Sequence, residues 1–357
     1  MLEAEKTIGS QTSSHNSEVI HAGLYYPRDS LKARTCVEGR QKLYAYCEAR
    51  QIPARKIGKL IVAATPAQEA RLADLQRQGM ENGVHDLLWL DGAGAARIEP
   101  EVRARAALFS PSTGIIDSAA LMLSLQADAE NRGAQFAFRS PVTRVDRLRG
   151  RFAVFTEDSA DEPLLCRLLV NCAGHGAHGV ARAMADYPPE LIPPRFLAKG
   201  NYASVSGRAP FSHLVYPLPE PGGLGVHVTL DLAGNMRLGP DLQWVDEVDY
   251  RPTPGVEDRF RRSVAEFWPE IHRREIAVCG CGVRPKISGP SAPAADFRID
   301  GPSVHGRSGL VVCFGIESPG LTASLALAEV IAAQLRPERV KRARRAARKP
   351  ASAATDL

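Results

Sequence analysis

Two short apolar runs, each ending at or near a glycine, place the strongest constraint on the fold. They are LLCRLLVNCAG at residues 164–174 and GLVVCFGI at residues 309–316. Short apolar and β-branched runs of this kind are typical of strands buried on both faces of a parallel sheet. Because parallel strands need long crossover connections, usually helical, the two runs predict an α/β domain.

The segments around these runs alternate between helical and extended patterns. Gly133 is the predicted stop of one helix. A further helix follows the second apolar run, with Ser318 as its predicted N-cap and Pro319 as its first helical residue. The other expected elements are a helix over 34–50, a strand over 57–65, a helix over 66–80 starting at a proline, a helix over 117–133 capped by Asp117, consecutive strands over 135–156, and a helix over 256–268.

Residues 195–250 show a different pattern, with short extended segments separated by Gly and Pro. The clearest example is a hairpin in which VHVTLDL and MRLG flank a turn at residues 233–235. This part of the chain therefore predicts a second, more antiparallel domain that is inserted into the α/β domain.

Composition excludes several classes of function. The net charge of +5 comes from the C-terminal end, where residues 336–349 hold eight Lys or Arg and one Glu. Since the rest of the chain is close to neutral, no nucleic-acid-binding core is expected. The seven cysteines include no C-x-x-C pair, which favours buried thiols in a reducing compartment over a disulfide framework. The start has no signal-peptide pattern and no apolar run is long enough to span a bilayer, so we expect a cytoplasmic or peripheral protein.

One glycine motif has two interpretations. Residues 174–179 match G-x-G-x-x-G after a strand, which is the pattern of a dinucleotide-binding loop. Prolines at 188, 189, 193 and 194 follow instead of a second strand with an acidic end, so a strand-to-loop turn is favoured. Cys172, His175 and His178 also suggest a metal site, but three ligands without a fourth favour packing.

Two other segments have the composition of functional loops. Residues 10–33 are rich in small polar residues and have no helical or strand period, as in a binding loop or a solvated connection. The turn at residues 315–326 delivers a helix N-terminus directly after a buried strand. Such an end either binds an anionic group or is an ordinary capped helix.

Several of these segments together resemble one family. NSEVIHAGLYYPRDSLKA, GNYASVSGRAPFSHLVYPLPEPGGLGVHVTLDLAGNMRLGPDLQWV, GVRPKISGPSAPAADF and GIESPGLTASLA look like the FAD-dependent L-2-hydroxyglutarate oxidases and dehydrogenases, which are D-amino-acid-oxidase-like flavoproteins. The resemblance runs from about residue 3 to residue 335. It implies an FAD-binding domain over 1–50, 111–190 and 287–335, a substrate domain with a mixed or antiparallel sheet over 51–110 and 191–286, and a basic disordered tail over 336–357.

The resemblance also implies where the FAD cofactor would bind. Glu3 matches the acidic residue that binds the adenosine ribose, and Val142 matches the position near adenine. Polar residues of the first loop would contact the pyrophosphate and the flavin, while two turns would pass close to the flavin ring. These residues are Thr12, Ser13, Ser14 and Asn16 in the loop, Ala173 and Gly174 in the first turn, and Gly315, Ile316, Glu317, Ser318, Pro319, Gly320, Leu321 and Thr322 in the second.

One part of the family pattern is not found. The usual first strand, G-x-G-x-x-G loop and helix are absent, since MLEAEKTIG matches the end of the second strand. Either the true start lies upstream or the chain is truncated. In the latter case we expect weak or absent FAD retention and an exposed sheet edge.

The implied reaction is oxidation of L-2-hydroxyglutarate to 2-oxoglutarate, with oxygen or a quinone as electron acceptor. Arg284 matches a carboxylate-binding arginine, and Lys286 is the candidate for the second carboxylate. His21 is the first candidate for the base and His227 the second, because imidazole suits proton transfer near neutral pH. Tyr216 is a candidate hydroxyl donor to the substrate.

Other interpretations remain open at this point. The substrate could be another 2-hydroxy acid, glycerol-3-phosphate or an amino acid, or the chain could be an inactive remnant that does not retain FAD. The basic tail fits either a peripheral contact with anionic lipid at the inner membrane or a solvated segment.

Overall fold

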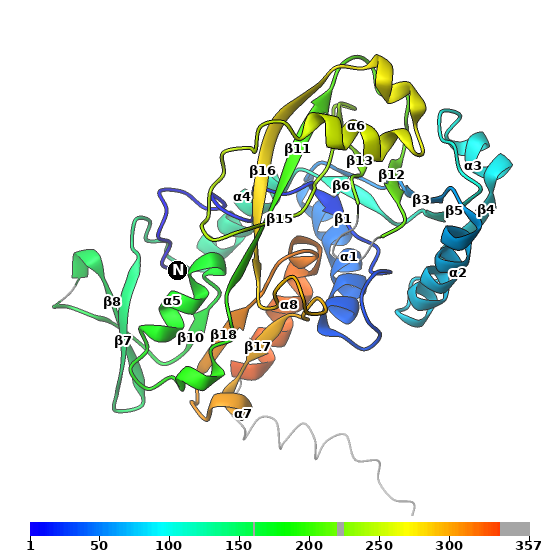
Figure 1. Ribbon diagram of the computed structural model, residues 1–357. Helices are drawn as coiled ribbons and strands as arrows, with labels where there is room; N and C mark the ends of the chain where they lie inside the picture. The colour runs from blue at the N-terminus through cyan, green and yellow to red at the C-terminus, as the bar shows by residue number, and fades with distance from the viewer. Residues whose placement is uncertain (160, 220–224, 336–357) are drawn as a thin grey trace, which may run out of the picture.

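The strands divide into one large sheet and three small ones. The computed structural model describes residues 1–159, 161–219 and 225–335, and the predicted basic tail lies outside these residues. Within them, one sheet has nine strands and three sheets have three strands each. Figure 1 shows the large sheet in one half of the molecule. In the other half, helix α8 (Gly320–Leu335) lies beside the small sheet formed by β10 (Leu169–Asn171), β17 (Arg298–Asp300) and β18 (Leu310–Phe314).

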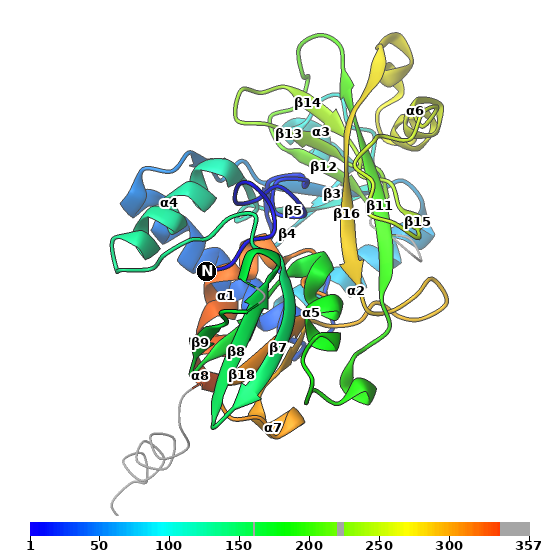
Figure 2. The ribbon, with the colours of Figure 1, turned by 90° about the vertical axis from the view of Figure 1, so that its left-hand side faces the viewer.

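The large sheet is mixed, and all its strands come from residues 59–110 and 196–286. Its order is β15-β11-β14-β13-β12-β3-β5-β4, and β16 pairs with β11; β12 and β3 are parallel, and the other pairs are antiparallel. The long strands β11 and β16 extend from this sheet toward the helical half (Figure 2). The bounds are β3 (Lys59–Ala63), β4 (Leu88–Asp91), β5 (Ala106–Ser110), β11 (Phe196–Val205), β12 (Leu214–Pro217), β13 (Val228–Leu230), β14 (Met236–Leu238), β15 (Gln243–Val245) and β16 (Ile276–Lys286).

The small sheets correct one prediction. Residues 164–174 form two strands rather than one: β10 is parallel to β18 as expected, whereas β9 pairs antiparallel with β8 in another sheet. The physical reason is that the first half of the run lies at a sheet edge, where Leu164 and Leu165 are exposed. The bounds are β1 (Val19–Ile20), β2 (Ala54–Arg55), β6 (Gly114–Ile116), β7 (Val142–Leu148), β8 (Arg151–Thr156), β9 (Leu164–Cys166), β10 (Leu169–Asn171), β17 (Arg298–Asp300) and β18 (Leu310–Phe314).

The predicted helices are present with small shifts at their ends. The Asp117 side chain accepts a hydrogen bond from the Ala120 N–H and so caps α4 as expected. No helix among the described residues has the length and apolar character to cross a bilayer. The bounds are α1 (Leu31–Arg50), α2 (Pro66–Glu81), α3 (Gly92–Ile98), α4 (Ser118–Glu130), α5 (Ala177–Arg182), α6 (Glu257–Ala265), α7 (Pro302–His305) and α8 (Gly320–Leu335).

The start of α8 differs from the prediction by one residue. The Pro319 carbonyl accepts the hydrogen bond from the Ala323 N–H, so Pro319 takes the N-cap position and Gly320 is the first helical residue. Ser318 therefore precedes the cap, and its side chain lies 3.3 Å from His21 Nε2. The Ser318 hydroxyl therefore does not cap the helix and lies beside His21 instead.

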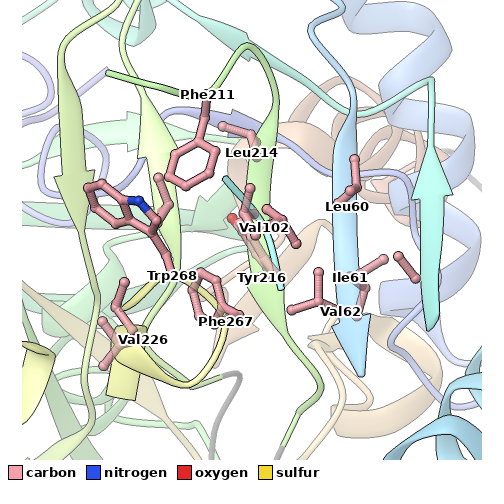
Figure 3. Close-up of a cluster of buried hydrophobic side chains, with 14 of the residues drawn as sticks. Leu60, Ile61, Val62, Val102, Phe211, Leu214, Tyr216, Val226, Phe267 and Trp268 are labelled. Atoms are coloured by element: carbon pink, nitrogen blue, oxygen red, sulfur yellow. The ribbon is translucent and has the colours of Figure 1, made fainter. Parts of the chain in front are cut away.

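The largest hydrophobic core covers both faces of the large sheet around β3 and β12, since consecutive residues of each strand belong to it. The close-up in Figure 3 shows Tyr216 and Leu214 on β12 beside Leu60 and Ile61 on β3. The Trp268 and Phe211 rings pack edge to face, with centroids 5.1 Å apart. This packing holds β3 and β12 in register and so fixes the side chains of both strands.

Helices α1 and α8 pack together at a glycine. A Cβ atom added at Gly39 of α1 would lie 2.8 Å from the Ala323 Cα of α8 and closer still to the Thr322 carbonyl. These are backbone atoms, which cannot move aside independently. The helices approach this closely only because residue 39 has no side chain.

Replacing Gly39 with alanine is expected to lower the free energy of unfolding by about 1–3 kcal/mol, the usual cost of overpacking. Gly179 in α5 is the matched control, since a Cβ there would meet nothing within 4 Å. Gly179→Ala should be neutral or stabilise by up to about 1 kcal/mol, because alanine favours the helix. Chemical denaturation of both variants checks this, and equal stabilities would contradict the close approach of the two helices.

Candidate active site

One cavity lies between the large sheet and the N-terminal end of α8. Its volume is about 490 Å³, within the range typical of small-molecule sites. Sixteen of the residues predicted to form the site line it: Thr12, Ser13, Asn16, His21, Gly174, Tyr216, His227, Arg284, Gly315, Ile316, Glu317, Ser318, Pro319, Gly320, Leu321 and Thr322.

The other five predicted residues lie outside this lining: Glu3, Ser14, Val142, Ala173 and Lys286. Lys286 is the most informative of them, because its ammonium donates a hydrogen bond to Glu317 Oε1 at 2.9 Å. The structure therefore does not bring Lys286 to the position expected for binding a substrate carboxylate. The roles of the other four residues in binding adenine, ribose or flavin remain predictions.

The glycine motif at residues 174–179 forms a turn. Gly174 has a φ of 54° and lines the cavity, and the following helix α5 has six residues and leads into β11 of the large sheet. A dinucleotide-binding unit would continue into a neighbouring parallel strand, so that interpretation is wrong. His175 Nε2 lies 2.9 Å from Thr12 Oγ1 and thereby joins this turn to the N-terminal loop. Among the described residues, no group of three His, Cys, Asp or Glu is placed to hold a metal ion.

His21 follows strand β1 and is held at its backbone by two helices. Its N–H donates to Thr322 Oγ1 of α8 at 3.1 Å, and its carbonyl accepts a hydrogen bond from Cys36 Sγ of α1 at 3.5 Å. Burial lowers the pKa of the imidazole to about 3, and the positive charges of Lys59 and Arg284 act in the same direction. His21 is therefore neutral at working pH, with a ring nitrogen available to accept a proton.

Tyr216 and His227 form a stacked pair on the large sheet. Because Val215 of β12 is paired with Val228, Tyr216 and His227 are direct cross-strand neighbours. Their ring centroids are 3.7 Å apart and their planes differ by 6°. Burial, followed by the charges of Lys59 and Arg284, lowers the pKa of His227 well below its usual value. The pair therefore adds a neutral imidazole and a phenol hydroxyl to the cavity wall.

Arg284 lies on β16, opposite Ala198 of β11, and also lines the cavity. In the described part of the chain it takes part in no ion pair, although its charge affects the pKa of His21 and of His227. Tyr202, on the neighbouring strand β11, lines the same cavity. A guanidinium without a carboxylate partner inside a cavity is suited to bind the carboxylate of a ligand.

Glu317 is the centre of a buried ionic network. Its Oε1 lies 3.1 Å from Lys32 Nζ of α1 and 2.9 Å from Lys286 Nζ of β16. Burial alone would raise the pKa of this carboxyl, but the nearby ammonium groups of Lys32 and Lys286 outweigh it and lower the pKa. The network fixes the turn before α8 against both the α1 helix and the β16 strand.

The cavity has two walls that fit an FAD cofactor. The N-terminal loop packs directly on β16, because Gly282 leaves room for the His15 carbonyl and His15 Nδ1 donates to the Cys281 carbonyl at 3.0 Å. The second wall is the first turn of α8, whose N–H groups lack intrahelical acceptors and favour negative charge. The side chains of Leu321, Leu327 and Ile331 add an apolar surface to this wall. Polar loop, helix end and apolar face together suit a cofactor with a charged and a flat aromatic part, so fold and cavity are those of a flavoprotein oxidoreductase.

Comparison with known proteins agrees with this class. The sequence profile described as FAD dependent oxidoreductase matches residues 1–334. Among solved structures, the dithionite-reduced L-α-glycerophosphate oxidase from Mycoplasma pneumoniae with FAD bound superposes with a TM-score of 0.82 at 25% identity, covering 94% of this chain and 87% of that one. Glycine oxidase from Geobacillus kaustophilus has the same fold, with a TM-score of 0.76 at 20% identity over 95% of this chain and 87% of that one.

Curated relatives narrow the class to one family. The mitochondrial L-2-hydroxyglutarate dehydrogenase of Arabidopsis thaliana is 41% identical, with 93% of this chain and 77% of that protein covered. The enzyme of the same name from Mus musculus is 27% identical, with 93% and 81% covered. This chain belongs to the FAD-dependent L-2-hydroxyglutarate dehydrogenase family.

His15, Tyr202 and Lys59 are among the residues at or near the cavity that were not predicted from the sequence. His15 and Tyr202 line the cavity, and Lys59 lies directly behind the Tyr216–His227 pair. Only Lys59 carries a signal in the sequence, since it is a charged residue at the start of the otherwise apolar strand KLIVA. A lysine at the first position of a strand is usually solvent-exposed, and nothing in the neighbouring sequence shows that this strand is buried from its first residue.

Proposed function

We propose that this chain oxidises L-2-hydroxyglutarate to 2-oxoglutarate with FAD as cofactor. The observation that carries the proposal is that one cavity holds both a neutral imidazole, His21, and a guanidinium, Arg284, that forms no ion pair with any residue the structure describes. A 2-hydroxy acid needs both groups, one to bind its carboxylate and one to take the proton of its hydroxyl. The names of the relatives supply the particular hydroxy acid.

Three side chains of the cavity have separate roles in the proposed oxidation. Arg284 binds the C1 carboxylate and fixes the orientation of C2, while His21 accepts the proton of the C2 hydroxyl as that group becomes a carbonyl. The Tyr216 hydroxyl donates a hydrogen bond to the substrate. FAD, held by the N-terminal loop and the first turn of α8, would supply the two-electron oxidation of C2, with oxygen or a quinone as the final electron acceptor.

Substrate binding also adjusts the base. The charge of Arg284 is one of the causes of the low pKa of His21, and a bound carboxylate neutralises that charge. A bound carboxylate therefore removes one part of the downward shift in the pKa of His21, while burial, its largest cause, remains. Binding and proton transfer are coupled through the same guanidinium.

The electron acceptor and the location form a second part of the proposal. A quinone acceptor would require the protein to approach a membrane. Residues 336–349, which lie outside the described residues, suit an anionic lipid surface by their charge. We propose peripheral contact on this ground alone.

The test is a visible absorption spectrum of the purified chain with added FAD. We expect L-2-hydroxyglutarate to bleach the flavin band and the D-enantiomer to leave it unchanged. Arg284→Gln should raise the substrate concentration needed for bleaching by about 10–150-fold, the loss of a charged hydrogen-bonding partner. Arg149→Gln is the control, since Arg149 is exposed. Absence of bleaching in the unaltered chain loaded with FAD would refute the proposed activity.

A further inference from the structure

A second cavity lies along helix α1 and shares no lining residue with the active-site cavity. Its volume is about 340 Å³, at the lower end of the range for small-molecule sites. Helix α1 itself packs beside strands β1 and β6 (Figure 1). The lining side chains come from α1 and from two loops: Arg40, Gln41, Tyr44, Ala45 and Glu48 of the helix, Lys56 after β2, and Ser112 between β5 and β6.

Arg40 carries a positive charge into this cavity and has no carboxylate partner. The residue is only 8% exposed, and its Nη1 donates hydrogen bonds to the Ala22 carbonyl at 3.3 Å and to Ser112 Oγ. Its Nε and Nη2 have no partner among the described residues, yet neither atom is enclosed by protein. A largely buried guanidinium is costly unless its donors are satisfied. The free N–H groups of Arg40 are therefore available to an acceptor in the cavity.

Lys56 adds a second positive charge on the other side of a fixed tyrosine ring. Its Nζ lies 4.6 Å from the centroid of the Tyr44 ring and forms no ion pair in the part of the chain that the structure describes. The Tyr44 hydroxyl donates to the Ser112 carbonyl at 3.2 Å, and a Cβ at Gly114 of β6 would collide with it. The wall that separates the two cations is thus held in place.

The charges of the cavity do not balance. Glu48 is the one acidic residue of the lining; it is exposed, and among the described residues it pairs with neither Arg40 nor Lys56. Two cations and one carboxylate leave an excess positive charge. A cavity in which two cations have no carboxylate within reach is suited to an anionic ligand.

We propose that this cavity binds a small oxyanion, the phosphate or carboxylate group of a metabolite, through Arg40, Lys56 and the Ser112 hydroxyl. The planar guanidinium can donate to two oxygens at once, and the ammonium acts as a point charge. The site is separate from the proposed oxidation and does not depend on it. Because Arg40 also holds the carbonyl of Ala22, the residue after His21, a bound oxyanion would restrain the segment that carries the candidate base.

The test is calorimetric titration of the FAD-loaded enzyme with sodium phosphate and, separately, with sodium acetate, with chloride keeping the ionic strength constant. The two titrations show which oxyanion the cavity takes. We expect Arg40→Gln to weaken the binding by about 10–150-fold, the loss of a charged hydrogen-bonding partner. Arg261→Gln is the matched control, because Arg261 also donates to two backbone carbonyls but lines neither cavity. Its affinity should equal that of the unaltered chain.

A second variant covers the case in which Arg40→Gln does not fold. Lys56 is exposed, so Lys56→Met should leave the fold intact and weaken the binding by about 2–5-fold, the effect of an exposed charge. Hydrogen exchange of the unaltered chain locates the ligand independently of these variants. The bound anion should slow exchange at residues 19–24 and 110–114, since Ala22 and Ser112 are bonded to Arg40.

Three results would overturn the proposal. The first is that neither anion binds to the unaltered chain, and the second is that both variants bind as well as the unaltered chain. The third is protection confined to residues 10–17 and 315–322, together with a loss of binding in Arg284→Gln, which would place the anion in the active-site cavity. None of these measurements requires turnover, so a failure of the proposed oxidation would leave this test intact.

Discussion

Replacing His21 with alanine is expected to lower kcat by about 10²–10⁴-fold, the usual contribution of a positioned general base. The imidazole is the only group in the proposal that accepts the hydroxyl proton, and its backbone is held by Thr322 and Cys36. The fold should survive the change, because these two contacts involve backbone atoms of His21. Turnover of L-2-hydroxyglutarate at saturating substrate and FAD measures the effect.

Two other histidine variants serve as controls for the His21→Ala prediction. His85→Ala alters an exposed histidine and should leave kcat unchanged. His227→Ala tests the second candidate base and should cost less than His21→Ala; the reverse order would transfer the role to His227. Since the pKa of His21 is about 3 before substrate binds, kcat/KM should show no titration of this group between roughly pH 5 and 9.

Replacing Glu317 with glutamine is expected to lower the free energy of unfolding by about 3–5 kcal/mol, the cost of leaving buried charges without their partner. Lys32 and Lys286 would both lose their carboxylate partner, and their side chains are buried, with exposed fractions of 7% for Lys32 and 11% for Lys286. The turn before α8 would lose its anchor, so affinity for FAD should fall as well. Denaturant unfolding, followed by titration with FAD, measures both effects.

The contribution of Glu317 to stability should depend on pH in a way that follows from the direction of its pKa shift. The pKa of Glu317 is lowered in the folded state from its ordinary value of 4.5. Its stabilisation is therefore present above that value and is lost as pH falls through the folded pKa. The difference in stability between the unaltered chain and Glu317→Gln should shrink below about pH 4.5.

Glu329→Gln is the control for this experiment. Glu329 also pairs with a lysine, Lys42, but the two side chains are 64% and 33% exposed. An exposed ion pair contributes at most about 1 kcal/mol. Equal losses in the two variants would show that burial of the Glu317 network does not strengthen it.

Local patterns in the sequence predicted most of the fold. Apolar runs, caps and turns located the helices α1, α2, α4 and α6 and the hairpin of β13 and β14 within a few residues, because each signal lies inside the element it defines. Two errors came from non-local effects. Residues 164–174 belong to two sheets, because β9 pairs with β8 and β10 pairs with β18. Helix α8 starts one residue later than predicted, and Ser318 contacts His21 instead of capping the helix.

The residues at and near the cavity fall into two groups. His21, Tyr216, His227, Arg284 and the turn before α8 were predicted from the sequence, through residue chemistry and the resemblance to a family. Lys59 was not, since a lysine at the start of a strand is ordinary until the strand is known to be covered on both faces. Lys286 was assigned to the substrate, because nothing in the sequence shows that Glu317 would pair with it.

The sequence by itself determined the class of fold, the cofactor and the chemical types of the groups at the site, since these follow from local pattern and family resemblance. Only the tertiary structure decided which charges are paired and which are free. Strand pairing together with helix packing brings Arg284 and Glu317 to the lining of one cavity and places Lys59 behind Tyr216 in its wall. Whether a buried charge holds the fold together or is free to bind a ligand depends on its neighbours in space, and the packing of the whole chain determines those neighbours.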